Sequence, residues 1–310
     1  MRSDQSARRV PTRVAWSALL AFGLVVPASA AQTVVLPASA CPQSDPLFAD
    51  GFQNAVPIPS APSNGSGGLY PGNITRTINV PSLGSRSYYL HVPGSYAPAQ
   101  PWPLLLALRG TSANSQPARE AAAQQIRNNW ASWADSAGFI VIAPVGNAGS
   151  NPNASGWGAP GDGAEISTAL DDAIAHYNIE QSRIYLWGFS AGAHYGHDLA
   201  LNHTDFFAAY GVSAGSLEAY ACTDDGSYPP TCAALLTGAQ PKIPVDIHLG
   251  NNDPLANPPY TAAGDAARFA AHGWVPNRTL HYTLFSGGHT YTVAQLGEIW
   301  NHLCPFALGP

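Results

Sequence analysis

A serine stands between glycines at a point where the chain is expected to turn sharply. The pentapeptide Gly-Phe-Ser-Ala-Gly at residues 188–192 follows the apolar run 184–187 and opens an amphipathic stretch. A strand that passes directly into a helix needs small residues on both sides of the serine. This turn would hold the hydroxyl above the end of a sheet, so Ser190 is the candidate nucleophile. The alternative is an ordinary Gly/Ser turn.

A serine hydroxyl attacks a carbonyl group only when a base takes its proton and a carboxylate orients that base. His289 follows the last predicted strand in a Gly-Gly turn, and Asp253 follows the strand before it. Since ligands bind at the carboxyl ends of parallel strands, we expect both side chains to meet Ser190. Asp224 and Asp225 are the alternatives for the acid.

Backbone N–H groups must stabilise the oxyanion that such an attack creates. Ala191, directly after the nucleophile, would supply one donor. The second should come from the loop after the third strand, at residues 108–112, and Thr111 is the residue we choose there.

His194 and His197 form an H-x-x-H pair on the helix after the serine. A zinc site needs a third ligand, and the glutamate of the H-E-x-x-H motif is missing. His248 lies inside a predicted strand and is interpreted as structural. No metal and no cofactor are predicted.

The N-terminus has the features of a secretory signal peptide. Arginines at positions 2, 8, 9 and 13 precede an apolar run over residues 14–26, and a small-residue cleavage site ends at residue 30. The run of about a dozen residues is too short to span a bilayer. We therefore expect residues 1–30 to be removed and the mature chain to be secreted, extracellular or periplasmic. An uncleaved anchor is the alternative.

The mature chain is expected to be acidic. Removing residues 1–30 would take away four arginines and one aspartate and change the formal net charge from −6 to −9. No basic cluster remains, and no later stretch is apolar enough for a membrane helix. Nucleic acids and membranes are therefore not expected as partners.

All four cysteines follow the predicted cleavage site, in a compartment where disulfides form. Cys222 and Cys232 bracket a Gly/Pro/Ser-rich loop, so we expect them to pair and to leave Cys41 with Cys304. Lipid attachment at Cys41 is the alternative, although the usual leucine three residues earlier is missing.

Residues 31–71 are rich in Pro, Ser, Ala and Gly and are expected to form a tether before a catalytic domain at residues 72–310. Strand candidates lie at residues 75–80, 87–92, 104–108, 139–143, 184–187, 207–212, 243–249 and 279–285. Helical patterns cover residues 118–137, 166–177, 191–201, 262–271 and 293–303. This order predicts an α/β fold, with a mostly parallel sheet of about eight strands, an antiparallel start and helices on both faces. The loop-like stretch 214–240 is expected to be a pocket wall.

Two segments extend the pattern beyond the pentapeptide. Residues 133–144 and 177–192 resemble the segments before and through the nucleophile of secreted α/β-hydrolase esterases. These are the feruloyl and acetyl-xylan esterases of carbohydrate esterase family 1 and the related polyhydroxybutyrate depolymerases. The resemblance covers residues 88–306 and implies an α/β-hydrolase fold with the triad Ser190, Asp253 and His289.

Two positions depart from that group. It usually has His-Gly after the third strand, where this chain has Arg109-Gly110. Many members carry a Trp shortly after the catalytic His, where this chain has Thr290-Tyr291-Thr292. Substrate preference therefore transfers poorly.

The sequence predicts a serine carboxylic ester hydrolase that acts through an acyl-enzyme on feruloyl, acetyl or related soluble esters. Trp157, Tyr195 and Tyr291 are candidates for an aromatic substrate-binding wall, although such side chains are as often plain core. A polyester depolymerase is the alternative, and the lack of room for a polymer-binding domain favours smaller esters. A non-catalytic hydrolase-like domain and a serine peptidase are further alternatives.

Overall fold

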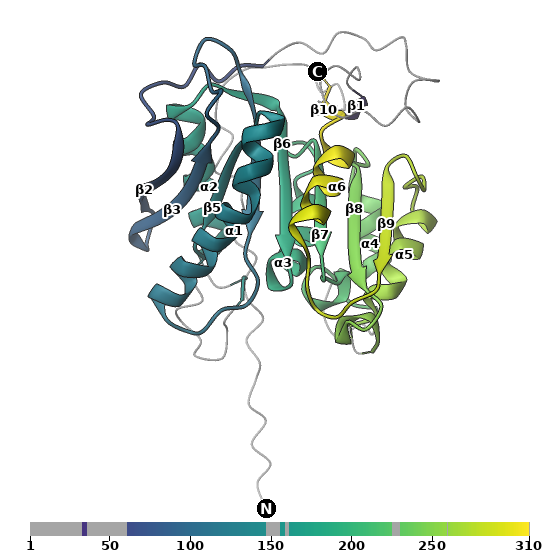
Figure 1. Ribbon diagram of the computed structural model, residues 1–310. Helices are drawn as coiled ribbons and strands as arrows, with labels where there is room; N and C mark the ends of the chain where they lie inside the picture. The colour runs from purple at the N-terminus through teal and green to yellow at the C-terminus, as the bar shows by residue number, and fades with distance from the viewer. Residues whose placement is uncertain are drawn as a thin grey trace, which may run out of the picture.

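An eight-stranded sheet runs through the molecule, with helices on both of its faces (Figure 1). The computed structural model describes residues 33–35, 61–146, 156–158, 161–224, 230–258 and 260–309. The strands of this sheet are β2 (Gly72–Val80), β3 (Gly84–Val92), β4 (Trp102–Leu108), β5 (Ile140–Pro144), β6 (Ile179–Phe189), β7 (Ala209–Ser213), β8 (Val245–Gly250) and β9 (Leu280–Phe285).

The strand order is β2-β3-β5-β4-β6-β7-β8-β9. β3 pairs antiparallel with β2 and β5, and the other neighbours pair parallel. The predicted mostly parallel sheet with an antiparallel start is therefore confirmed. Because β6, β8 and β9 run in the same direction, their carboxyl ends lie at one edge of the sheet.

Helices cover the sheet in two layers. They are α1 (Gln116–Ala137), α2 (Asp162–His176), α3 (Ala191–Asn202), α4 (Cys232–Gly238), α5 (Asp265–Ala271) and α6 (Val293–Leu303). α1 and α6 pack on one face and the other four on the opposite face (Figure 1). Among the described residues, no helix is both long and apolar enough to span a membrane.

The central strands are apolar on both faces because both faces are covered. In β4, Leu104 and Leu106 join the core under α2 and α3, whereas Leu105 joins the core under α1 and α6. In the second core, the Phe139 ring stacks on Trp300 with ring centroids 3.6 Å apart. Each fully buried side chain of this size contributes roughly 1.5–3 kcal/mol.

Capping residues define the two helices over the second core. Ser115 accepts the Ala118 N–H at the start of α1, and Gly138 ends that helix with φ 75°. α6 begins with a capping box between Thr292 and Gln295. These local signals explain why the predicted ends of the two helices lie within two residues of the observed ends.

Three features were not predicted. α4 lies within the stretch 214–240 that was expected to be a loop. Strand β1 (Thr33–Val35), within the expected tether, pairs antiparallel with β10 (Phe306–Leu308). Residues 61–71 already contact the domain, because the Ser63 N–H donates to Ile179 O at 2.8 Å. The division into signal peptide, tether and catalytic domain stays a prediction, since residues 1–30 and 36–60 lie outside the described residues.

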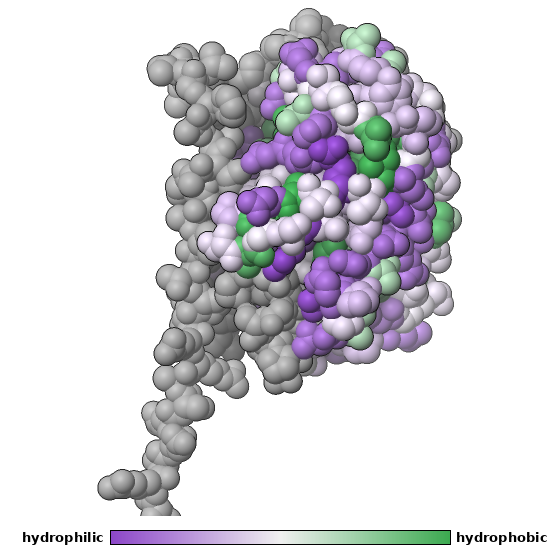
Figure 2. Space-filling view, turned by 90° about the vertical axis from the view of Figure 1, so that its left-hand side faces the viewer, coloured by the Kyte–Doolittle hydropathy of each residue, from purple (hydrophilic) through white to green (hydrophobic). Residues whose placement is uncertain are grey.

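The β2 side of the molecule faces the viewer in Figure 2. Hydrophilic side chains predominate there, and hydrophobic ones form small separate patches. This agrees with the alternation of more and less buried residues along β2.

Candidate active site

Ser190 lies in the turn that joins β6 to α3. Its backbone has φ 54° and ψ −118°, and such a positive-φ conformation costs a non-glycine residue roughly 1–3 kcal/mol. A Cβ on Gly188 would lie 2.2 Å from Gly192 O, and one on Gly192 would lie 2.4 Å from Leu108 O. Both glycines are therefore required by close backbone approach.

The loops after β8 and β9 are held against each other by the backbone. The Asn252 N–H donates to Gly287 O at 2.8 Å. A Cβ on Gly250 would lie 2.3 Å from Gly288 O, so only glycine permits this approach. These two loops carry the predicted acid and base.

The structure brings the three predicted triad residues together. His289 Nε2 lies 2.7 Å from Ser190 Oγ, and His289 Nδ1 lies 3.0 and 3.1 Å from the Asp253 carboxylate oxygens. Asp253 is 1% exposed, and its Oδ1 also accepts the Leu255 N–H at 2.9 Å. The arrangement can move a proton from the serine hydroxyl to the imidazole while the carboxylate orients the ring.

The alternative acids lie elsewhere. Asp224 accepts the Cys232 N–H at 3.3 Å and the Arg268 Nε–H at 3.2 Å. Asp225 lies outside the described residues. Among the described carboxylates, Asp253 is the one within hydrogen-bond distance of the His289 ring.

The expected oxyanion donors flank the nucleophile. Ala191 is the first residue of α3, directly after Ser190. A Cβ on Gly110 would lie 3.3 Å from Ser190 Cβ, so the loop after β4 lies against Ser190. Thr111 follows Gly110 in that loop, and its role as the second donor stays a prediction.

Arg109 stands where the esterase and depolymerase group usually has a histidine. Its buried side chain anchors this loop. The side chain is 1% exposed, donates from Nε to Val145 O at 2.7 Å and donates from Nη1 to Gly110 O at 2.9 Å. Its own carbonyl accepts the Trp157 indole N–H at 2.7 Å. Burial lowers the pKa of Arg109 to about 10, so the guanidinium stays charged at neutral pH.

Two of the three predicted wall aromatics are buried. Trp157 and Tyr195 are 9% and 6% exposed, and their rings stack with centroids 6.0 Å apart. The Arg109 guanidinium lies 5.2 Å from the Trp157 ring centroid on which it stacks. Burial favours a packing role for this pair, and contact with a substrate stays a prediction.

The third aromatic, Tyr291, braces the residues behind the base. Its ring packs edge to face on Trp187 and Phe189, with centroids 5.1 and 4.8 Å away. Its hydroxyl accepts the Asn129 side-chain N–H at 2.6 Å. The Phe189 ring in turn packs on the His289 ring, with ring centroids 5.4 Å apart.

The H-x-x-H pair has other partners. His194 Nδ1 accepts the Ser216 N–H at 2.9 Å, and His197 Nδ1 lies 3.1 Å from the Tyr210 hydroxyl. Burial lowers the pKa of His194 to about 4 and that of His197 to about 3. Both rings are therefore neutral at neutral pH and already hydrogen-bonded.

A stapled wall, residues 216–224, lies beside α3, one helical turn beyond the nucleophile. Ser216 contacts His194 and donates its hydroxyl to Tyr260 O.

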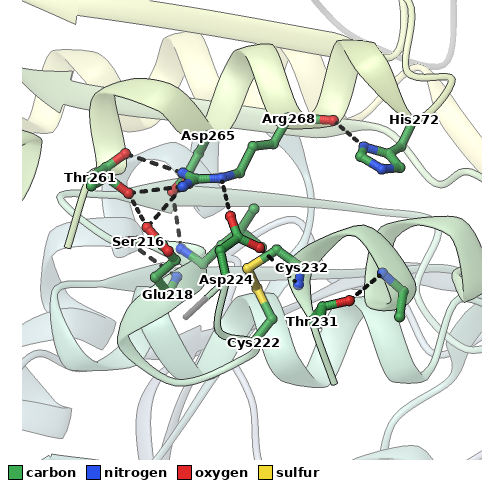
Figure 3. The surroundings of a disulfide bond; sticks show 12 residues. Ser216, Glu218, Cys222, Asp224, Thr231, Cys232, Thr261, Asp265, Arg268 and His272 are labelled. Carbon is green, nitrogen blue, oxygen red and sulfur yellow. Dashed lines mark hydrogen bonds and ion pairs between the residues drawn. A yellow bond between two sulfur atoms is a disulfide. The ribbon is translucent and has the colours of Figure 1, made fainter. Parts of the chain in front are cut away.

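The predicted disulfide between Cys222 and Cys232 is present, with a Cα–Cα distance of 4.8 Å. Figure 3 shows Arg268 beside it, bonded to three carboxylates. These are Glu218, Asp224 and Asp265. Cys304 is also disulfide-bonded, and its predicted partner Cys41 lies outside the described residues.

Sequence reasoning missed the anchoring role of Arg109 and the contact between His194 and the stapled wall. The Arg109 signal was present as a departure from the His-Gly pattern, but its partners lie 36 and 48 residues away in the chain. No local spacing reveals contacts of that kind.

Comparison with curated proteins finds two enzymes of related types. The chain is 31% identical over 132 residues to a bifunctional acetylxylan esterase/xylanase of Neocallimastix patriciarum, a match that covers 42% of this chain and 18% of that protein. It is 30% identical over 223 residues to poly(3-hydroxyalkanoate) depolymerase C of Paucimonas lemoignei, a match that covers 69% of this chain and 46% of that protein. The chain thus spans less than half the length of both relatives.

Solved structures agree on the architecture. A CE1 ferulic acid esterase from Anaeromyces mucronatus superposes with a TM-score of 0.57 at 15% identity, covering 77% of this chain and 91% of that one. The fold is that of an α/β-hydrolase. No family profile matches the chain. The predicted resemblance to the feruloyl and acetyl-xylan esterase and polyhydroxybutyrate depolymerase group is confirmed.

Proposed function

We propose that this protein is a secreted serine carboxylic ester hydrolase that acts through an acyl-enzyme. The observation that carries the proposal is the continuous contact from Ser190 Oγ through the His289 ring to the buried Asp253 carboxylate. The strained backbone at the serine and the glycines around it support the same role.

The mechanism follows from this geometry. Ser190 Oγ attacks the ester carbonyl while its proton passes to His289 Nε2, and Asp253 stabilises the imidazolium that forms. The Ala191 and Thr111 N–H groups bind the oxyanion. The leaving alcohol takes the proton from His289. Water then attacks the acyl-serine while His289 Nε2 takes its proton. That proton passes to Ser190 Oγ as the acyl–oxygen bond breaks and the free acid leaves.

The substrate class rests on the relatives. One of them is named an acetylxylan esterase/xylanase, and one structural neighbour is named a ferulic acid esterase. We therefore propose plant cell-wall-type feruloyl or acetyl esters, or related soluble esters, as substrates. A polyester depolymerase is the second candidate, because the relative that covers the larger share of this chain is a poly(3-hydroxyalkanoate) depolymerase.

The compartment is proposed on two grounds. Residues 1–30 have the pattern of a signal peptide, and the disulfide between Cys222 and Cys232 suits an oxidising compartment. The acidic composition, with a formal net charge of −6, does not favour nucleic acid as a partner.

A substrate panel tests the proposal. We expect the purified chain to hydrolyse p-nitrophenyl acetate and at least one of methyl ferulate, acetylated xylan and polyhydroxybutyrate film, and Ser190→Ala to hydrolyse none. Turnover of the film above the soluble esters would select the depolymerase. No ester turnover, with cleavage of peptide substrates, would select a peptidase, and no turnover at all would select a non-catalytic domain.

A further inference from the structure

A second group of polar side chains lies under α6, away from the triad. Asp246 and His248 are two residues apart on β8, so both lie on the face of the sheet that α6 covers. Both are 0% exposed. His281 on β9 is the register partner of Asp246 in the parallel pair. His302 of α6 stacks on His281, with ring centroids 4.8 Å apart.

The three side chains on the strands point at a common centre. Asp246 Oδ1 lies 2.9 Å from His281 Nδ1 and 3.2 Å from His248 Nε2. One ligand atom from each of the three residues lies within 4.8 Å of the others. Donors at a metal–ligand distance of 2.0–2.1 Å around tetrahedral zinc are about 3.3 Å apart. The two contacts of Asp246 Oδ1, at 2.9 and 3.2 Å, lie near this spacing, and the two imidazoles would draw together when a metal binds.

Hydrogen bonding alone leaves this buried group incomplete. Asp246 Oδ2 and both ring nitrogens of His248 are buried and have no hydrogen-bond partner in the part of the chain that the structure describes. Asp246 Oδ1 is hydrogen-bonded to His281 Nδ1 at 2.9 Å, and His248 Nε2 lies 3.2 Å from the same oxygen. Buried polar atoms without a hydrogen-bond partner destabilise the folded state, because they lose their hydration without replacement. A cation between the carboxylate and the imidazole would satisfy both.

We propose that Asp246, His248 and His281 bind one divalent transition-metal ion. Two imidazole nitrogens and one carboxylate oxygen suit Zn²⁺, Co²⁺ or Ni²⁺, whereas Ca²⁺ and Mg²⁺ prefer all-oxygen sites. The His281 side chain is 38% exposed, which gives the ion access from solvent. The H-x-x-H pair of α3 takes no part in this site.

The metal would fasten the last strand of the sheet. β9 is an edge strand whose one neighbour in the sheet is β8. The loops after β8 and β9 carry Asp253 and His289, so the ion would stabilise the scaffold of the acid and base without entering the chemistry. This role is independent of the proposed function and holds for any activity of the triad.

A cobalt titration tests the site in the full chain, purified without a histidine tag and stripped with a chelator. We expect one equivalent of Co²⁺ to produce the visible absorption of a four-coordinate site, and Zn²⁺ to displace it. At a Zn²⁺ concentration 100 times Kd, Tm should rise by roughly 5–10 °C. At temperatures below both Tm values, kcat should not change with metal.

Variants assign the ligands. His281→Gln, at the exposed edge, should keep the fold and lose about 100-fold or more in Co²⁺ affinity together with the Tm shift. His272→Gln, a histidine of another surface, is the matched control and should bind like the wild type. If wild type gives neither absorption nor a Tm shift, or if His281→Gln binds as tightly as the control, the site does not exist as proposed. Asp246→Asn gives a second ligand test if it folds.

Discussion

At the scale of single residues, we expect the proposed triad to act as one unit, because each contact depends on the next. Ser190→Ala would remove the proposed nucleophile, and His289→Ala would remove the proposed base. Each should lower kcat by about 10⁴–10⁶-fold while the circular dichroism spectrum stays native, and the double variant should be little worse than either. Steady-state kinetics on a soluble ester measures this. Losses that multiply in the double variant would show that the two residues work separately.

Asp253→Asn addresses the orienting role. The nucleophile and base remain, but the imidazolium loses its buried carboxylate partner. We expect Asp253→Asn to keep a kcat about tenfold or more above that of Ser190→Ala. Full activity in Asp253→Asn, with loss in Asp224→Asn, would move the acid to the stapled wall.

The hydrogen bonds of Arg109 lead to a further prediction for a single residue, which the sequence alone did not suggest. Replacing Arg109 by Ala removes the donors to Val145 O and Gly110 O, so the loop beside the nucleophile loses its anchor. We expect kcat to fall by about 10–100-fold with little change in KM, since oxyanion stabilisation acts in the transition state. Arg86→Ala, on β3, is the control. A rise in KM alone would instead make Arg109 a substrate contact.

The sequence predicted those parts of the candidate site that lie directly after the ends of strands. Ser190, Asp253 and His289 each follow a strand end, and a pattern of strands reveals strand ends. The contacts of Arg109, and the packing of Trp157 on Tyr195, join segments that no periodicity connects. Burial was therefore the property that sequence reasoning could not assign to the aromatic candidates.

At the scale of elements, α3 carries a pH dependence of stability. Burial depresses the pKa of His197 to about 3 in the folded state, against about 6.5 in the unfolded chain. The unfolded state therefore binds more protons below pH 6.5, and stability falls as the pH drops from 6.5 toward 3. His197 alone should reduce the free energy of unfolding by about 2–3 kcal/mol between pH 7.5 and 4.5.

Urea unfolding at the two pH values measures the effect. His197→Leu removes the titrating ring and should make the difference between pH 7.5 and 4.5 smaller by that amount, although it also loses the contact with Tyr210. An equal pH difference in variant and wild type would show that His197 is not the titrating group.

The stapled wall gives a second prediction at this scale. Its staple is the disulfide, and Arg268 holds the same segment through ion pairs. Cys222→Ser with Cys232→Ser should therefore change the relative kcat/KM among acyl chains and aryl esters more than it lowers Tm. Breaking the predicted link of Cys41 with Cys304 should do the reverse.

Peptide mapping of the non-reduced protein comes first, because a link of Cys41 to any other cysteine would remove the premise of the second variant. An unchanged substrate profile in the Cys222/Cys232 double variant would show that the stapled wall does not border the acyl pocket.

Strands whose apolar residues are buried on both faces of the sheet could be predicted from the sequence. Short elements such as β1, β10 and α4 could not. The buried runs of the sheet are apolar on both sides, so they stand out in the sequence. β1 and β10 are three residues each and pair over a distance of 271 to 275 positions in the chain. α4 has seven residues, too few to show a periodicity inside a Gly/Pro-rich stretch.

At the scale of the whole molecule, the α/β-hydrolase fold brings three chain segments far apart in sequence to one edge of one sheet. The fold leaves the ester open, because many chemistries share this scaffold. We propose that the loops that border the edge, including the stapled wall, decide between feruloyl, acetyl and polymer esters.

The central claim is that an acyl group passes through Ser190. Rapid quenching of the enzyme with p-nitrophenyl acetate, followed by peptide mass spectrometry, tests it most directly. We predict a burst of p-nitrophenol close to one equivalent per chain when deacylation is slow, and one acetyl group on the peptide that contains Ser190. Trapping should vanish in Ser190→Ala. Steady turnover with the acetyl group on another residue, or an equal burst in Ser190→Ala, would contradict the claim.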